Sequence, residues 1–150
     1  MNLHHKKQAS IVPGGNTALL DAIGGAIHHI GNIHKYAREE DVPEHTIFVI
    51  TTDGLENASH RYSSSEVKRM IEREKEKYGW EFIFLAANID AVETAENIGI
   101  SRNRATNYRA DGEGTAHMFG AMAQAVSAMR CSAALDEDWA AELERDAGRR

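Results

Sequence analysis

The sequence predicts an α/β protein with a parallel sheet and helices on both faces of that sheet. Two observations indicate this fold. Segments with an apolar period near 3.6 residues alternate with short apolar runs, in the order helix, strand, helix, strand, helix, strand, helix. The runs at 46–52 and 80–87 are continuously apolar, which is typical of strands buried on both faces of a parallel sheet. We therefore expect about three strands and four helices, connected by right-handed crossovers.

The first predicted element is a helix from Thr17 to about Arg38, after a polar lead-in loop at 1–16. Pro13-Gly14-Gly15 indicates a turn within that loop. The apolar residues of the helix share one stripe: Leu19, Leu20, Ile23, Ala26, Ile27, Ile30, Ile33 and Ala37. Three glycines, at 24, 25 and 31, weaken a helix, and we expect a close approach to the sheet to offset their cost.

The next two elements carry local start and stop signals. The strand Thr46–Thr52 ends at Asp53-Gly54, which is a common turn pair. Ser63 and Glu66 have the spacing of a capping box, and the helix that they start ends at Gly79. Its inward face is predicted to carry Val67, Met70, Ile71 and Tyr78.

The second half of the chain continues the alternation. Trp80–Ala87 is a second buried strand, and Asp90 and Glu93 cap a short helix that ends near Gly99. A weak third strand at 105–108 and a helix over 114–130 follow.

The last twenty residues have a different character. Asp136 can cap a short helix with Leu135, Trp139 and Leu143 on one side. This segment is either a detachable tail or an extra packing element. The predicted organisation is a lead-in loop (1–16), an α/β domain (17–130) and a C-terminal helical tail (131–150).

Composition excludes several classes of function. The net charge is -6 and the basic residues are scattered, so no nucleic-acid footprint is expected. A single cysteine, Cys131, excludes an intramolecular disulfide and a cysteine-built zinc site. No apolar run approaches the length of a membrane span, and no signal-peptide segment follows Met1. We expect a cytoplasmic protein with neither a nucleic-acid nor a membrane partner.

Polar residues follow two of the predicted strands. In open α/β sheets, ligands bind outside the carboxyl ends of the strands, where Asp53 follows the first strand and Asn88 the second. A carboxylate and a hydroxyl at such a place suit Mg²⁺. Local interpretations stay open, because Asp53 can simply form the turn with Gly54, and Asn16 or Thr17 can cap the helix.

Two of these segments resemble von Willebrand factor A domains. Residues 15–23 (Gly-Asn-Thr-Ala-Leu-Leu-Asp-Ala-Ile) are similar to the threonine-bearing loop and following helix of that family. Residues 48–54 (Phe-Val-Ile-Thr-Thr-Asp-Gly) look like the strand that ends in the aspartate of the metal-ion-dependent adhesion site. The likeness extends through 80–88 to the helix that ends near Arg130, and it is to bacterial members of intracellular type. It implies a three-layer, Rossmann-like fold.

The family holds a divalent ion with three loops. The resemblance assigns Thr17 to the second loop and Asp53 to the third, with a candidate ligand rim at Asn16, Gly54, Asn57 and Asn88. The first loop, an Asp-x-Ser-x-Ser motif, is absent from these 150 residues, and nothing before Thr17 supplies the family's first three strands. We therefore expect the back half of the domain, in which Mg²⁺ or Mn²⁺ binds weakly.

The missing half has a consequence for the sheet. In the doubly wound order 3-2-1-4-5-6, losing the first three strands leaves Thr46–Thr52 at an edge. A long apolar edge strand invites pairing with another chain. We expect a homodimer, or a partner strand that covers this edge.

The favoured function is a protein–protein interaction module, not an enzyme. The sequence has no Gly-x-Gly-x-x-Gly, Gly-Lys or Gly-x-Ser-x-Gly motif. No histidines pair at i and i+4, so exposed or capping roles are expected for them. Two alternatives stay open: a remnant or split half-domain completed by dimerisation or a partner chain, and a small-molecule-binding α/β enzyme.

Overall fold

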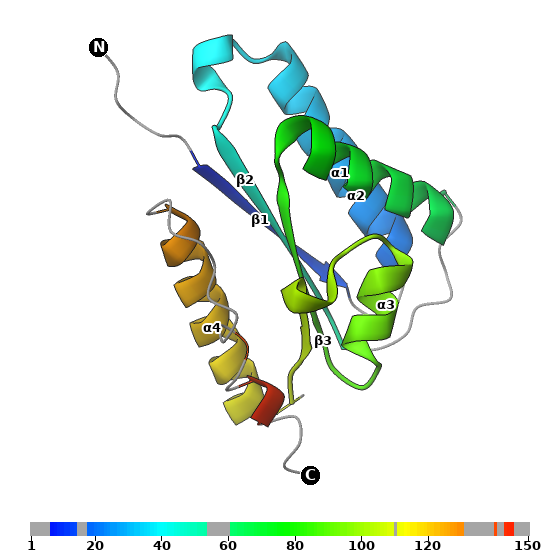
Figure 1. Ribbon diagram of the computed structural model, residues 1–150, viewed down its shortest axis with the longest axis vertical. Helices are drawn as coiled ribbons and strands as arrows, with labels where there is room; N and C mark the ends of the chain where they lie inside the picture. Colours follow the sequence, from blue (N-terminus) through cyan, green and yellow to red (C-terminus); the bar gives the residue numbers. More distant parts are fainter. Residues whose placement is uncertain are drawn as a thin grey trace.

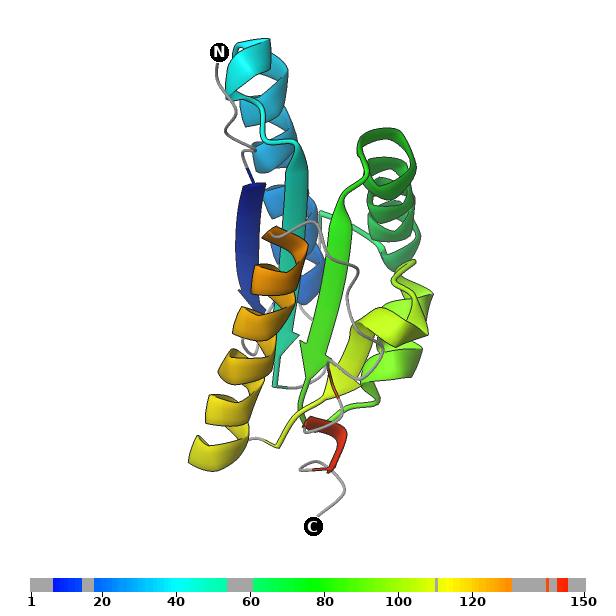
Figure 2. The ribbon, with the colours of Figure 1, turned by 60° about the vertical axis from the view of Figure 1, so that its left-hand side comes forward.

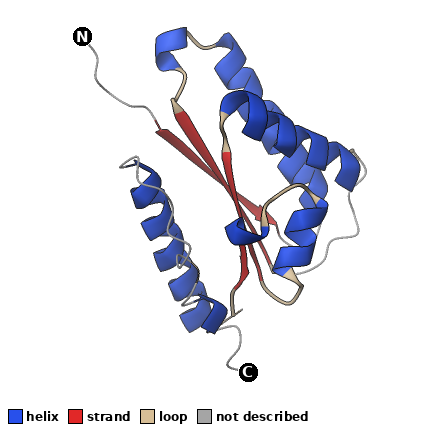
Figure 3. Ribbon diagram, in the orientation of Figure 1, coloured by secondary structure: helices blue, strands red, loops and turns tan. Residues whose placement is uncertain are grey.

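The structure is a computed structural model that describes residues 7–14, 18–53, 61–109, 111–130, 140 and 143–145. Four strands and four α-helices alternate along the described chain (Figure 1; Figure 3). Their bounds are β1 Lys7–Gly14, α1 Leu19–Tyr36, β2 His45–Thr52, α2 Ser64–Tyr78, β3 Glu81–Ala86, α3 Ala91–Asn97, β4 Ala105–Asn107 and α4 Gly112–Arg130. Short 3-10 turns at Glu39–Asp41 and Arg102–Arg104 precede β2 and β4. The predicted α/β class and parallel sheet are confirmed.

The strands form one parallel sheet in the order β1-β2-β3-β4. The pairing of β1 with β2 aligns Lys7 with His45 and Gly14 with Thr52. The predicted lead-in loop at 1–16 is therefore wrong for residues 7–14. Pro13 and Gly14 indicated a turn, but edge strands tolerate proline because one side of such a strand makes no ladder hydrogen bonds.

Strand β1 also changes the prediction for the next strand. The segment Thr46–Thr52 lies between β1 and β3 and is not an edge of the sheet. The argument for a homodimer, or for a partner strand covering this segment, was wrong in its premise, because the chain's own first strand covers it.

The strand order explains how the helices are distributed. Each crossover advances by one strand in the same direction, and right-handed crossovers then place their helices on the same face. Figures 1 and 2 show α1, α2 and α3 on one side of the sheet and α4 on the other. The sheet has one hydrophobic core on each face, and alternate residues of β2 point into each. Phe48 and Ile50 belong to the core under α1, α2 and α3, and Ile47 and Val49 belong to the core under α4.

The described part of the C-terminal tail belongs to the α4 side. Ala140 is 4% exposed and Leu143 is fully buried, and both belong to the buried cluster that contains Ile83, Leu85 and Met122. At these positions the tail is a packing element. The other tail residues named above, Leu135, Asp136 and Trp139, lie outside the described residues.

The helix ends follow local chemistry. The capping box of α2 is confirmed, since the Ser63 hydroxyl accepts from the Glu66 N–H and the Glu66 carboxylate accepts from the Ser63 N–H. Gly79 ends α2 in the left-handed conformation, and Asp90 caps α3. The cap of α4 is Asp111, whose carboxylate accepts from the Gly114 N–H at 2.7 Å; sequence reasoning missed it.

The glycines of α1 have different surroundings. A Cβ at Gly24 would lie 2.5 Å from Cγ of Tyr62, so this glycine lets an aromatic ring approach the helix, and the predicted approach to the sheet is wrong for it. A Cβ at Gly25 or Gly31 would meet nothing within 4 Å.

Among the residues that the structure describes, no helix has the length and apolar character needed to cross a membrane.

Candidate functional site

The carboxyl ends of the strands bring together two of the predicted site residues. Asp53 follows β2 directly and is exposed, and Asn88 follows β3. The Asn88 side-chain amide donates a hydrogen bond of 2.9 Å to the backbone carbonyl of Asp53. Asn88 has a φ of 65°, a left-handed conformation that asparagine tolerates better than most residues. The backbone of Asp53 is thus held in place while its carboxylate stays accessible.

Two residues at the end of β4 complete this rim. The Asn107 side-chain amide donates to the carbonyls of Ala86 and Ile89, and its oxygen accepts from the Ala91 N–H at 3.2 Å. The Tyr108 hydroxyl donates to the Thr52 carbonyl at 3.4 Å. These bonds connect the ends of β2, β3 and β4. Sequence reasoning placed a strand at 105–108 but did not apply to its end the rule that selected Asp53.

The charge at the rim influences Tyr108. Burial raises the pKa of the Tyr108 phenol above its ordinary value, and the nearby Asp53 carboxylate adds to the rise. Tyr108 therefore stays a neutral hydrogen-bond donor at physiological pH, and its hydroxyl bonds to the carbonyl of Thr52, the residue before Asp53.

Asp21 lies in the first turn of α1, where an acidic residue is expected to interact with the positive end of the helix dipole. Its observed role is different. Its carboxylate accepts hydrogen bonds of 2.9 Å from the backbone N–H groups of both Arg61 and Tyr62. It thereby ties the segment before α2 to the start of α1. The two acceptor bonds show that Asp21 supports the structure of this end of the sheet.

Four predicted site residues are not among those that the structure describes: Asn16, Thr17, Gly54 and Asn57. Residues on both sides of the first pair are described: Gly14 ends β1 opposite Thr52, and Ala18 precedes α1 without a side-chain capping bond. In the described ranges, no three His, Cys, Asp or Glu side chains gather as a metal site.

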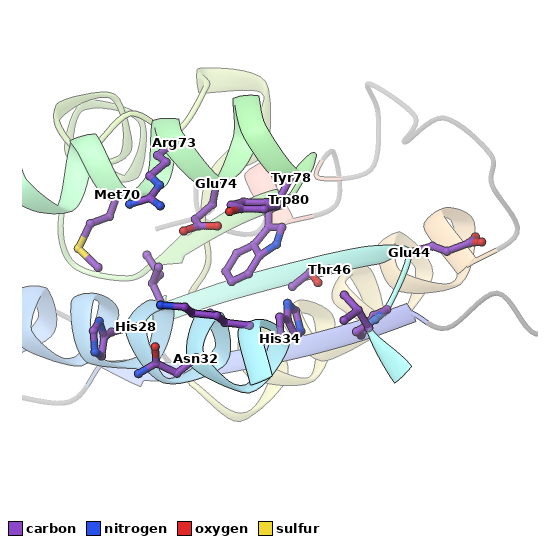
Figure 4. Close-up of a pocket in the computed structure, with 15 residues that line it drawn as sticks. His28, Asn32, His34, Glu44, Thr46, Met70, Arg73, Glu74, Tyr78 and Trp80 are labelled. Carbon is purple, nitrogen blue, oxygen red and sulfur yellow. The ribbon is translucent and has the colours of Figure 1, made fainter. Parts of the chain in front are cut away.

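A pocket of about 540 Å³ lies at the opposite end of the sheet, where the strands begin (Figure 4). One wall is the second half of α1 and the other is the second half of α2. Trp80 and Thr46 lie at the base, and residues 42–44 close one side. Sequence reasoning missed this pocket.

Aromatic rings and two titratable groups define the character of the pocket. Trp80 stacks on Phe48 with ring centroids 6.2 Å apart, and the His34 ring meets Trp80 edge-on at 5.8 Å. Burial lowers the pKa of His34, so this imidazole is neutral at pH 7. Burial raises the pKa of the Glu74 carboxyl, and the charges of Arg73 and Lys77 oppose that rise with smaller effects.

The histidines were expected to be exposed or to act as caps. His28, His29 and His45 are exposed, as predicted, and His34 is partly buried against Trp80.

Comparison with known proteins adds no family to this description. No family model, no curated protein and no solved structure matches the chain.

Proposed function

We propose that the chain is a protein-binding module of the von Willebrand factor A type, which binds its partner at the rim formed by the carboxyl ends of the strands. The observation that carries the proposal is the exposed Asp53 directly after a central strand, with its backbone fixed by Asn88. The family resemblance gives the same aspartate as a metal ligand.

The rim supports this function by its rigidity. The side chains of Asn88, Asn107 and Tyr108 donate hydrogen bonds to backbone carbonyls at the ends of neighbouring strands. The surface around Asp53 is therefore preorganised. A preorganised surface loses little conformational entropy when it binds a partner. The connection from β1 to α1, which contains Thr17, leaves from the end of β1, where Gly14 pairs with Thr52.

We propose that the rim binds a divalent metal ion only weakly. Mg²⁺ and Mn²⁺ prefer octahedral oxygen ligands, and Thr17 with Asp53 would supply two of them while water fills the remainder. In the family, the ion bridges to an acidic residue of the ligand protein. Here we propose that the surface of the rim provides most of the contact and that the ion contributes orientation.

Substoichiometric Mn²⁺ tests the metal site, because its unpaired electrons broaden the NMR signals of nearby amides even when binding is weak. Broadening is expected at the amides of Asp53, Asn88 and Tyr108. The variant Asp53→Ala should lose it. Glu76→Ala is the matched control, because it removes an exposed carboxylate from α2. Broadening that survives in Asp53→Ala would remove the metal site from the proposal.

Protein binding is tested by comparing what the immobilised chain and its Asp53→Ala variant retain from a cell extract, in Mg²⁺ and in EDTA. We expect at least one protein that the original chain retains in Mg²⁺ and that both EDTA and the substitution release. Identical retention under all four conditions would contradict a binding surface centred on Asp53.

In the split-domain alternative, the partner chain binds at the edge of the sheet and not at the rim around Asp53. Strand β1 is the outermost described strand on its side, so a complementing chain would pair with β1. Only backbone pairing is needed there, and Asp53→Ala would leave such a complex intact.

A further inference from the structure

The pocket between α1 and α2 has the size of a small-molecule site. Its volume of about 540 Å³ lies within the range of roughly 300–1,000 Å³ that is usual for such sites. It opens at the amino ends of the strands, away from the rim around Asp53, so it is separate from the proposed protein-binding surface. Figure 4 shows side chains from both helices around the same space, with Trp80 between them.

Gly31 leaves part of this space open. It lines the pocket from α1, and a Cβ at this position would meet nothing within 4 Å. A glycine inside a helix costs about 1 kcal/mol relative to alanine. At Gly24 the packing of Tyr62 accounts for that cost, but no packing partner does so at Gly31. The consequence of Gly31 in this structure is room in the pocket.

The lining combines an apolar, aromatic base with one partly buried carboxylate. Trp80 and Ile27 are 5% and 2% exposed, so only a small part of each reaches the pocket, and the partly buried Met70 adds to this apolar lining. Glu74 faces the same space from α2 (Figure 4). Among the described residues, no hydrogen bond or ion pair holds the Glu74 carboxylate.

The charges around the pocket favour a cation near Glu74. Burial raises the pKa of Glu74, and the charges of Arg73 and Lys77 only partly oppose this rise, so a further cation beside the carboxylate would stabilise its ionised form. The cationic side chains that line the pocket are Arg73, which is exposed, and Lys35, whose ammonium lies 5.5 Å from the centre of the Tyr36 ring. Aromatic rings and a carboxylate together are the usual means of binding an organic ammonium group.

We propose that this pocket binds a small aromatic amine, with the ring of the ligand against Met70 and the exposed part of Trp80 and its ammonium group at the Glu74 carboxylate. The inference is independent of the proposed protein-binding function. It assigns a ligand site to the end of the sheet at which neither the resemblance nor the strand-end rule places one.

Phenethylamine is a suitable probe, with phenylacetate as an anion of similar size and 2-phenylethanol as a neutral one. Ligand-observed NMR should show saturable binding of the amine at millimolar concentration, and binding of phenylacetate weaker by about tenfold or more. Absence of saturable amine binding, or equal binding of all three probes, would overturn the proposal.

Two variants locate the site. Gly31→Leu fills the pocket and should abolish amine binding, whereas Gly25→Leu adds the same side chain to an exposed glycine of the same helix outside the pocket and should leave binding unchanged. Glu74→Gln keeps the shape and removes the charge, so amine binding should weaken about tenfold while 2-phenylethanol binding stays the same.

Circular dichroism establishes that each variant is folded. If Gly31→Leu does not fold, Glu74→Gln decides the question by itself. Unchanged amine affinity in Glu74→Gln would show that the proposed ammonium contact does not exist.

Discussion

At the scale of single residues, the start of α1 anchors the segment that begins at Arg61. The Asp21 carboxylate accepts from two consecutive backbone N–H groups of that segment, and Gly24, one turn further along α1, gives the Tyr62 ring its place against the helix. The two contacts involve residues about forty positions apart in the chain. They fix the approach of α2 to α1, and hence one wall of the pocket.

Gly24 and Gly25 form a matched pair for testing this packing. In Gly24→Ala the new Cβ would lie 2.5 Å from the Tyr62 ring, so the ring must move, and we expect the free energy of unfolding to fall by about 1–3 kcal/mol. In Gly25→Ala the Cβ meets nothing, and the better helix propensity should raise the free energy of unfolding by about 1 kcal/mol. Urea denaturation measures both. Equal effects of the two substitutions would refute the close approach of Tyr62.

Residues whose role depends on a strand end could be predicted, and residues whose role depends on distant packing could not. Asp53 and Asn88 follow apolar strands, so the parallel sheet alone places them at one rim. Glu74 and Trp80 face the same pocket as His28 only because α1 and α2 pack side by side. The sequence did not distinguish Gly31, which lines the pocket, from Gly25, which lies outside it, because both are glycines inside the same helix.

At the scale of elements, local signals determined most boundaries. The capping box and Gly79 bound α2 as predicted, because hydrogen bonds within a few residues decide where that helix starts and ends. Strand β1 was missed because its pairing with β2 joins residues about forty positions apart, and its last residues carry a turn signal. A strand of that kind is defined by its neighbour in the sheet and not by its own composition.

The contribution of the α2 cap to the free energy of unfolding should be measurable. Ser63→Ala removes the hydroxyl that accepts from the Glu66 N–H at 3.2 Å, and we expect it to lower the free energy of unfolding by about 1 kcal/mol. Ser64→Ala changes an exposed serine in the first turn of the same helix and should have a much smaller effect. Chemical denaturation of the two variants compares them directly, and a larger loss in Ser64→Ala would show that the helix starts elsewhere.

At the scale of the whole molecule, the order of the strands separates two functional ends. The three crossovers advance in one direction, so α1, α2 and α3 lie together over one face, and the α1–α2 groove opens where the strands begin. The other face depends on α4 and the buried Leu143. The rim with Asp53 lies where the strands end, so the proposed protein-binding surface and the proposed amine pocket can be altered separately by substitution.

Strand β1 gives the last prediction, because it covers one side of β2. It pairs with β2 along the whole of His45–Thr52, a strand whose residues 46–50 are all buried. Deleting residues 1–14 would leave an apolar strand with unpaired backbone groups, and such edges pair with other chains. We expect this variant to self-associate in size-exclusion chromatography with light scattering, and to unfold at lower urea concentration.

Deleting only residues 1–6 is the control, because it retains all of β1, and it should change neither property. If the chain with the longer deletion keeps the association state and the stability of the full chain, β2 does not depend on β1. The edge predicted at Thr46–Thr52 would then again be the surface at which to look for a partner.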